Sequence, residues 1–411
     1  MAAASERRKR VLILVENLSV PFDRRVWQEA RALLAAGYSV SVICPKGAED
    51  EPGFELIDGV HVYRYRPAPE ASSAAGYARE YATALAATFL LTCKVLLTRG
   101  FDVIHACNPP DLLFLIGGFF KLFGKKFVFD HHDINPELYE AKFSRRDAVY
   151  RLMRWFEYLS FRAADVSLAT NESYRRIAIE RGRMPPQRVF VVRSGPSFER
   201  MRIVPPDARL KFGRRFLVGY VGVMGEQENI GDLLLSVQYI VNVLRRTDIH
   251  FGLVGSGTSL ADLRALATRL QIDRYVTFTG RVSDEIMLKV LNTADICVNP
   301  DAPNEMNDKS TMNKILEYMA LGKPIVQFDL TEGRVSAQGA SLYARRGDVE
   351  DFAEKIVELL DDASQRKAMG ELGRRRVEDA LEWRRQVPAL LAAYEALWPT
   401  EVESLYETWT S

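Results

Sequence analysis

The chain has 411 residues, 47% of them hydrophobic and 27% charged, and its formal net charge is +1. This length predicts two or three domains, and the composition is that of a globular protein, which excludes a disordered chain and a coiled coil. The near-neutral charge argues against attraction of the whole surface to nucleic acid, so we expect no nucleic-acid partner.

The apolar runs and the cysteines of the sequence indicate the cellular compartment of the protein. The longest apolar runs, residues 82–93 and 112–120, are shorter than the roughly 20 residues that span a bilayer. The widely separated cysteines are Cys44, Cys93, Cys107 and Cys297. This spacing is typical of reduced thiols and argues against a metal site. We expect a protein without a metal that does not cross the membrane and is cytoplasmic or peripheral on its inner face.

Short apolar runs alternate with helical patterns through the first half of the chain. The predicted elements are a helix at 21–37 and strands at 10–17, 38–45, 60–65, 101–107, 125–133 and 164–171. The run 60–65 alternates like an edge strand. Strands that alternate with helices predict βαβ units, and hence a parallel sheet covered by helices on both faces.

The pattern is lost over residues 194–213, which contain Pro196, Pro205 and Pro206 and which we interpret as a linker. Beyond it the predicted elements are helices at 230–246 and 259–270 and strands at 216–223, 249–257, 275–280, 295–300 and 323–329. The sequence therefore predicts an α/β fold of two Rossmann-like, doubly wound parallel-sheet halves. Parallel sheets bind ligands at the carboxyl ends of their strands, so we expect the site in a cleft between the halves.

Charge is unevenly distributed. Residues 141–200 contain 13 Lys and Arg against 6 Asp and Glu, whereas residues 348–411 contain 8 against 15. Within residues 141–162, arginines alternate with large aromatic side chains, a pattern that fits a helix lying on an anionic membrane surface. A solvated helix whose aromatic side chains pack on the core fits equally well.

The stretch NDKSTMNKILEYMALGKPIV, residues 307–326, predicts a polar loop, a helix and a buried strand. Ser310 or Thr311 is expected to cap a helix that begins near Met312 and Asn313, so that backbone N–H groups face the loop. Lys309 and Lys314 add positive charge there, which predicts a site for a phosphate or diphosphate. Glu317 further along the helix suits the two hydroxyls of a ribose. The alternative is a capped surface helix with Lys314 paired to Glu317.

Two glycine-rich stretches follow strands of the second half. Gly255 and Gly257 end the run LVGSG, and Gly222 and Val223 end the run GYVGV. Glycine permits close approach of the backbone to a ligand, but a tight turn explains it as well. The GxGxxG pattern of a dinucleotide site is missing from the sequence.

A cluster of titratable residues, Asp130, His131, His132 and Asp133, follows a buried strand of the first half. Adjacent histidines on a strand point to opposite faces, so we do not expect both to bind one metal ion. One of them is expected to bond to a substrate, with Asp130 or Asp133 setting its orientation. A structural role is the alternative.

The first helix begins with the sequence DRR. Arg24 and Arg25 on its first turn favour an anion, and Asp23 is expected to orient one of them. Two solvated arginines are the alternative. We include Asp23, Arg24 and His131 among the predicted substrate-binding residues.

Together these features resemble the family 4 glycosyltransferases, which have the GT-B fold. The similar stretches are residues 11–45, 191–196, 219–223, 253–267, 276–287 and 317–326, and the last, EYMALGKPIV, is the most specific. The resemblance implies an acceptor-binding domain over residues 1–205 and a donor-binding domain over 206–385. It also implies a helix over 386–411 that crosses back to the first domain, where Trp398 and Trp409 would pack.

The resemblance also assigns roles to residues. It implies that Glu317 binds the donor ribose, and that His132 contacts the transferred sugar. The segment that borders the base is Gly280, Arg281 and Val282.

The chain departs from the family pattern at three places. Lys309 stands where the family usually has a second glutamate. Val223 and residues 228–229 replace an arginine and a lysine that commonly bind the diphosphate. We expect Lys314 above all to take over that role, and Lys309 to influence which sugars fit.

The resemblance implies a retaining, metal-independent transfer of a sugar from a nucleotide diphosphate sugar, most commonly a UDP-sugar, to a hydroxyl acceptor. The departing phosphate would take the acceptor proton. The subgroup implied acts on cell-surface polysaccharides and lipid-linked sugars. We expect His132, Asp133, Lys309 and Lys314 in catalysis, and no cofactor besides the donor substrate. The alternatives are a nucleotide-sugar epimerase on the same fold and a non-catalytic nucleotide-sugar-binding partner of a membrane assembly.

Overall fold

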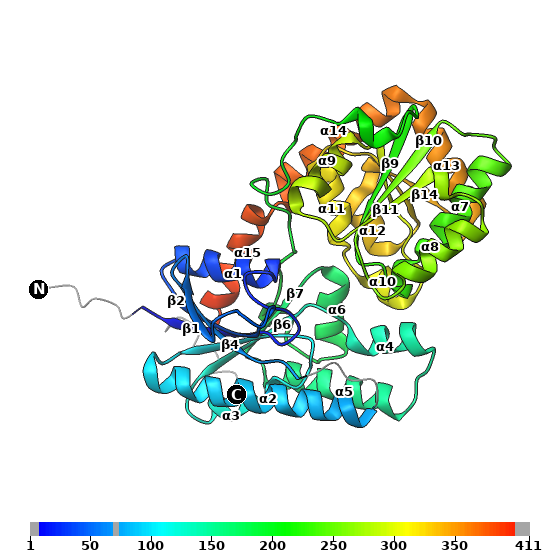
Figure 1. Ribbon diagram of the computed structural model, residues 1–411. Helices are drawn as coiled ribbons and strands as arrows, with labels where there is room; N and C mark the ends of the chain where they lie inside the picture. The colour runs from blue at the N-terminus through cyan, green and yellow to red at the C-terminus, as the bar shows by residue number, and fades with distance from the viewer. Residues whose placement is uncertain (1–7, 69–73, 399–411) are drawn as a thin grey trace, which may run out of the picture. The chain divides into compact units, whose positions relative to one another are not determined.

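The computed structural model describes residues 8–68 and 74–398, which form two compact units. Unit 1 holds the chain up to Glu140, Ser144–Arg193 and the chain from Gln386 onward, and unit 2 holds Ala141–Phe143 and Ser194–Arg385. Each unit is built around its own sheet (Figure 1). The two predicted α/β halves are therefore confirmed.

The sheet of unit 1 has the strand order β3-β4-β2-β1-β5-β6-β7-β8. Its strands are β1 Arg10–Leu14, β2 Ser39–Pro45, β3 Phe54–Ile57, β4 Val60–Tyr65, β5 Val103–Cys107, β6 Lys126–His131, β7 Val166–Ala169 and β8 Val189–Val191. All neighbours pair in parallel except β3 and β4. The prediction of β4 as an edge strand is wrong, because β3 pairs with its outer side.

Helices cover this sheet. They are α1 Arg24–Ala35, α2 Ala74–Thr98, α3 Phe114–Lys121, α4 Asn135–Phe143, α5 Ala148–Ala163, α6 Glu172–Glu180 and the C-terminal α15 Trp383–Glu395. The last helix is fixed to unit 1 by the Tyr394 hydroxyl, which lies 2.8 Å from His105 Nδ1. The expected partner Trp398 lies with its ring 3.6 Å from Lys9 Nζ, whereas Trp409 lies outside the described residues.

The sheet of unit 2 is entirely parallel, with the order β11-β10-β9-β12-β13-β14. Its strands are β9 Phe216–Val221, β10 Ile249–Val254, β11 Val276–Gly280, β12 Ile296–Asn299, β13 Ile325–Phe328 and β14 Ser341–Ala344. Its helices are α7 Ile230–Asn242, α8 Leu260–Arg269, α9 Asp284–Thr293, α10 Glu305–Lys309, α11 Asn313–Ala320, α12 Thr331–Ala337, α13 Val349–Asp361 and α14 Ala363–Arg376. Helical turns also occur at Pro186–Arg188, Ala208–Lys211, Glu226–Glu228, Asp273–Tyr275, Gln338–Ala340 and Val377–Leu381.

The segment interpreted as a linker packs onto unit 2. Met201 is completely buried in the core of that unit, and the Asp207 backbone N–H donates to the Thr293 hydroxyl over 2.8 Å. These contacts place residues 194–205 with unit 2, so the units divide between Arg193 and Ser194, earlier than the expected boundary after residue 205.

Helix α2 is longer than its apolar run indicated. Residues 79–98 are long and apolar enough to span a bilayer by length and composition, and only 22% of that stretch is buried in the protein. The expectation that no segment reaches this length is therefore wrong, because Lys94 interrupts the apolar run in the sequence without ending the helix.

Two neighbouring glycines of α3 differ sharply in their surroundings. A Cβ atom on Gly117 would lie 2.4 Å from a ring carbon of Phe127 on β6, whereas one on Gly118 would meet nothing within 4 Å. Both substitutions to alanine gain about 1 kcal/mol of helix propensity. We expect Gly118→Ala to raise the free energy of unfolding by up to about 1 kcal/mol, and Gly117→Ala to lower it by about 1–3 kcal/mol through overpacking.

Urea unfolding of the two variants beside the unchanged chain measures the difference. Equal effects of the two substitutions would show that α3 does not pack on β6 through Gly117.

Candidate active site

The carboxyl ends of three strands of unit 2 meet at glycines. The Gly222 backbone N–H donates to Val254 O and that of Gly255 donates to Gly280 O, each over 3.1 Å. Gly255 has a φ of +139°, and a Cβ atom there would lie 1.8 Å from Gly222 O. Glycine is therefore required for the packing of these loops, and the close approach leaves them without side chains at the strand ends.

Helix α11 brings Glu317 to the same edge of this sheet. The Val221 backbone N–H, at the end of β9, donates to the Tyr318 hydroxyl over 2.9 Å, which fixes the helix against that strand end. The neighbouring Glu317 carboxylate accepts a bond of 2.6 Å from Arg200 Nη1, and Arg200 also bonds to Asp284 over 2.7 Å. The alternative interpretation paired Glu317 with Lys314, whereas in the structure Glu317 bonds to Arg200.

Lys314 is buried in an ion-pair cluster. Its ammonium group bonds to Asp301 over 2.8 Å and to Glu228. Burial opposes its charge, but Asp301 and Glu228 raise the pKa of Lys314 above its usual value. The pKa of Asp301 is raised to about 6. Burial is the main cause and Glu228 adds to it, while Lys314 acts in the opposite direction and lowers this pKa. The sequence presented Lys314 as a cation open to a diphosphate, whereas the structure surrounds it with carboxylates.

The loop before α11 differs from its prediction. Residues 305–309 form the short helix α10, and Lys309 on its last turn bonds to Glu305 over 2.6 Å. The Ser310 hydroxyl donates to Met306 O in this helix, so Ser310 closes α10. The prediction that Ser310 or Thr311 caps α11 is wrong, because Met312 occupies the N-cap position without a side-chain bond.

The other predicted donor-binding residues lie around this edge. Asn313 and Arg281 are exposed, and Val223, just beyond β9, has 58% of its surface exposed. Val282 is half-buried and packs against the core. A separate cavity of about 530 Å³ lies at the opposite edge of the sheet, where Asp295 and Pro324 precede β12 and β13.

In unit 1, a buried arginine organises the end of β6. Arg25 Nη2 lies 2.7 Å from Asp130 Oδ1 and 3.2 Å from Glu29, and Arg25 Nη1 donates to Val192 O over 2.6 Å. Arg25 was expected to face an anion, and this anion is Asp130 within the chain. Arg24 is exposed, and Asp23 caps α1 by accepting a bond from the Val26 N–H over 3.1 Å.

His132 bonds to the same carboxylate. Its Nε2 lies 2.5 Å from Asp130 Oδ2. Burial works against ionisation of Asp130, but Arg25 and His132 hold the pKa of Asp130 well below its usual value. Arg25 Nε lies 2.9 Å from the same ring nitrogen, so Asp130 and Arg25 together fix the orientation of the His132 ring. Of the two orienting residues expected, the structure selects Asp130.

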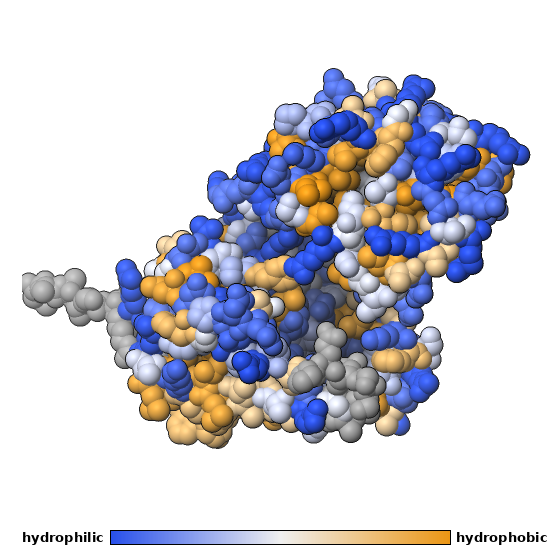
Figure 2. All heavy atoms as spheres, in the orientation of Figure 1, coloured by the Kyte–Doolittle hydropathy of each residue, from blue (hydrophilic) through white to orange (hydrophobic). Residues whose placement is uncertain are grey.

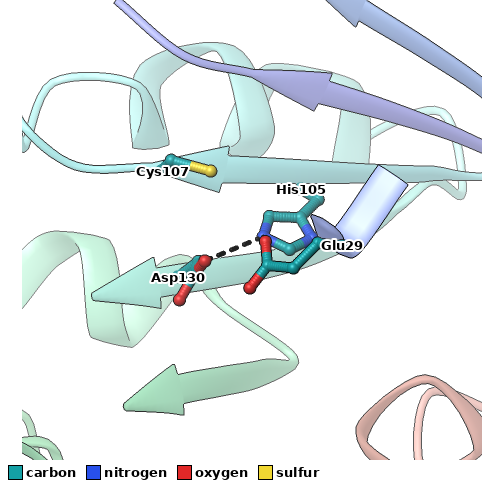
Figure 3. A group of neighbouring side chains, drawn as sticks. All are labelled: Glu29, His105, Cys107 and Asp130. Carbon is teal, nitrogen blue, oxygen red and sulfur yellow. Dashed lines mark ion pairs between the residues drawn. The ribbon is translucent and has the colours of Figure 1, made fainter. Parts of the chain in front are cut away.

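Glu29, His105, Cys107 and Asp130 form a group whose ligand atoms all lie within 4.8 Å of one another (Figure 3). All four are buried. Burial raises the pKa of Glu29 well above its usual value and lowers the pKa of His105, so burial disfavours the charged form of both side chains. The guanidinium of Arg25 already balances Asp130. This arrangement is a compensated ion-pair network, and a divalent cation would compete with Arg25 for its carboxylate.

His131 lies on the other face of β6, as strand alternation predicted. It is completely buried, with its ring centroid 5.1 Å from that of Phe161 and 5.2 Å from that of Tyr174, and its Nε2 lies 3.4 Å from Glu157. This burial leaves no surface of His131 for a substrate, so the structure does not support its predicted substrate contact.

Asn108 is a residue that the sequence reasoning missed. Its side-chain oxygen accepts bonds from the backbone N–H groups of His132 and Asp133 over 2.6 and 3.1 Å, and its amide donates to Asp133 O over 2.6 Å. Asn108 therefore fixes the loop after β6. Its signal in the sequence is a polar residue directly after the buried strand β5.

Burial raises the pKa of Asp133, while His132 and His131 lower it.

Family models match both units. The model described as "Glycosyl transferase 4-like domain" matches residues 23–195, and the model described as "Glycosyl transferases group 1" matches residues 215–362. The matched ranges therefore follow the division of the chain into two units.

Curated relatives match parts of the chain. It is 32% identical over 146 residues to a GDP-mannose-dependent monoacylated alpha-(1-6)-phosphatidylinositol monomannoside mannosyltransferase of Corynebacterium glutamicum, covering 34% of this chain and 37% of that protein. It is 25% identical over 268 residues to the capsular polysaccharide biosynthesis glycosyltransferase CapM of Staphylococcus aureus, covering 60% of this chain and 62% of CapM. The chain thus spans less than two thirds of the length of either relative.

Solved structures agree over nearly the whole chain. Sucrose-phosphate synthase from Thermosynechococcus elongatus superposes with a TM-score of 0.76 at 18% identity, covering 95% of this chain and 99% of that one. Anabaena Alr3699/HepE in complex with UDP and glucose superposes with a TM-score of 0.71 at 15% identity, covering 95% of this chain and all of that one. At such identities the likeness shows the fold, which is the GT-B fold. With both of its units matched by glycosyltransferase family models, this chain belongs to the family 4 glycosyltransferases.

Proposed function

We propose that the protein transfers a sugar, with retention of anomeric configuration and without a metal ion, from a nucleotide diphosphate sugar to a hydroxyl acceptor. Unit 2 binds the donor and unit 1 the acceptor. A UDP-sugar is the first choice of donor, since a structure of the same fold was solved with UDP and glucose, although one relative is named for GDP-mannose. Cell-surface polysaccharide or glycolipid synthesis in the cytoplasm is the proposed setting.

The observation that carries this proposal is the position of Glu317. Its carboxylate lies on α11, whose Tyr318 bonds to the end of β9, and Arg200 holds one of its oxygens over 2.6 Å. An ionised carboxylate has two oxygens with about four acceptor sites, so it accepts bonds from two adjacent ribose hydroxyls as well as from arginine.

Lys314 acts on the diphosphate through its cluster. Asp301 and Glu228 compensate the charge of Lys314, so its ammonium group supplies less positive potential to a ligand than a lysine without carboxylate partners would. The chemistry needs negative charge to be stabilised on the departing diphosphate, so we propose that Lys314 exchanges one carboxylate for a phosphate oxygen on binding. Lys309, half-exposed on α10, contributes to the choice of sugar.

The acceptor side is His132. Asp130 and Arg25 hold its ring at Nε2, and we propose that its other ring nitrogen bonds to a hydroxyl of the sugar or of the acceptor. We also propose that α5 touches the membrane surface, since its outward residues include Leu152 at 47% and Trp155 at 54% exposure, beside the exposed Arg151.

A donor screen with product analysis tests the function as a whole. The correct nucleotide sugar raises the melting temperature of the chain, because it binds only the folded state. We expect one of the UDP-, GDP- and TDP-sugars to do so. That donor should be hydrolysed slowly alone and transferred to a hydroxyl acceptor with EDTA present. An isomerised sugar would instead identify an epimerase, and loss of transfer in EDTA would refute metal independence.

Glu317→Ala should weaken donor binding by about 100-fold or more in calorimetry, because two hydrogen bonds to a charged group contribute about 1.5–3 kcal/mol each. Asp284→Ala is the matched control, since Asp284 is the other carboxylate bonded to Arg200. We expect the control to change the dissociation constant by about twofold or less, the range of an exposed ion pair. Equal effects of both variants would assign the loss to Arg200 and remove Glu317 from the ribose site.

His132→Ala should lower kcat by about 100-fold, in the range of a lost proton-accepting or hydrogen-bonding group at the reacting centre. Donor affinity should be unchanged, because the nucleotide is proposed to bind unit 2. His61→Ala, which removes a partly exposed histidine from β4, is the control and should leave kcat unaltered. Normal transfer by His132→Ala would exclude the histidine from the reaction.

A further inference from the structure

Helix α2 buries small residues and exposes large apolar ones. Its buried positions are Ala84, Thr88, Thr92 and Val95, spaced as one side of a helix. Leu90 and Leu97 on the outside have 68% and 85% of their surfaces exposed. A helix covering a sheet normally places its large apolar side chains on the sheet and polar ones outward. In α2 this distribution is inverted.

Helix α3 continues the same apolar surface. Its exposed apolar residues are Leu115 and Phe119, and Leu122 and Phe123, which directly follow its last residue, are also exposed, at 82% and 62%. The two helices touch through Phe89 and Phe119, whose ring centroids are 5.3 Å apart. Leu90, Leu97, Leu115, Phe119, Leu122 and Phe123 together form what we call the α2–α3 face. In Figure 2, hydrophobic side chains gather along the lower left of unit 1, over these helices.

Basic residues accompany this face. Lys94 is exposed on α2 between Leu90 and Leu97, Arg99 is exposed just beyond α2, and Lys125 follows α3. Residues 81–126 contain five Lys and Arg against two Asp. Of these two, Asp111 is buried and Asp102 is paired with Arg10 over 3.4 Å. Lys121 is paired with Asp165 over 2.9 Å, so the positive charge beside the apolar residues comes from Lys94, Arg99, Lys125 and Lys126.

We propose that the α2–α3 face docks the protein on an anionic lipid bilayer, a property that goes beyond the proposed reaction and does not depend on it. An exposed apolar patch is typical of a protein or membrane contact, and the basic residues favour the negatively charged surface of anionic lipids. Helix α2 lies in the plane of the interface and does not span the bilayer, because its buried side packs on β2 and β4. Helix α5 packs beside α3, with the Phe114 and Phe156 ring centroids 6.5 Å apart, so the proposed contact of α5 adjoins this face.

Vesicle flotation with the full chain tests the proposal. We expect binding to phosphatidylcholine vesicles that contain about one third phosphatidylglycerol, and weak binding to phosphatidylcholine alone. The triple variant Leu97→Ser, Leu122→Ser and Phe123→Ser should bind the anionic vesicles about tenfold less or weaker still, because it loses the apolar contact.

The control variant replaces three exposed apolar residues of unit 2 by serine: Ile203, Val243 and Leu372, with 62%, 58% and 40% of their surfaces exposed. We expect this control to bind vesicles like the unchanged chain. Since the triple variant alters exposed side chains only, its melting temperature should also be unaltered. The variant Lys94→Glu with Lys125→Glu leaves the apolar residues intact and should weaken binding to anionic vesicles by about fivefold or more for each cation.

Several results would overturn the proposal. They are failure of the unchanged chain to float with anionic vesicles, equal loss in the control, and binding that the two lysine substitutions do not affect. A dimer in light scattering that the triple variant dissolves, without vesicle binding, would show instead that this face joins two copies of the chain. Loss of binding in Leu152→Ser with Trp155→Ser, but not in the triple variant, would assign the contact to α5 alone.

Discussion

A buried cation is stable only beside a carboxylate, and the proposed functional residues of each unit are arranged around such a pair. In unit 1, Arg25 on α1 bonds to Asp130 at the end of β6 and to the backbone after β8. In unit 2, Lys314 on α11 bonds to Asp301 after β12 and to Glu228 after β9. Removing one partner of a buried pair typically costs about 3–5 kcal/mol, because it leaves the other charge uncompensated. These pairs therefore fix the strand ends where ligands of parallel sheets bind.

The same pairs explain how far sequence reasoning reached at the site. It identified Arg25, Lys314 and Glu317 from their places at the ends of predicted strands and helices, and the family resemblance singled out His132 from the two adjacent histidines. It interpreted the cations as open to a ligand, because residue types and local spacing carry no information about a partner 105 or 86 positions away. Arg200 was missed for the same reason, since its partner Glu317 lies 117 positions further along the chain. Strand alternation, which is local, correctly placed His131 and His132 on opposite faces.

The fold followed from local periodicity, and its errors occurred where periodicity is short or absent. Alternating strands and helices predicted both parallel sheets. Residues 194–213 have little periodicity and several prolines, so they were interpreted as a linker, although Met201 is buried in the core of unit 2. The five residues of α10 are too few for a helical pattern, and without that helix Ser310 appeared to be the cap of α11. Tertiary contacts, rather than propensity, decided both cases.

In helix α2, the apolar pattern of the sequence predicts burial of the side that the structure exposes. Leu90, Leu97 and the aromatic residues of α3 would normally predict the buried side, and a search for continuous apolar runs ends at Lys94. The structure buries Thr88 and Thr92 instead, and the Thr92 hydroxyl donates to Thr88 O over 2.7 Å, so this residue needs no polar partner from the sheet. Small side chains let α2 lie close to the sheet, and its large apolar side chains then remain outside. Leucine side chains that stay exposed to water contribute no burial free energy to folding. A contact with a surface outside unit 1 would bury them and explains their exposed position.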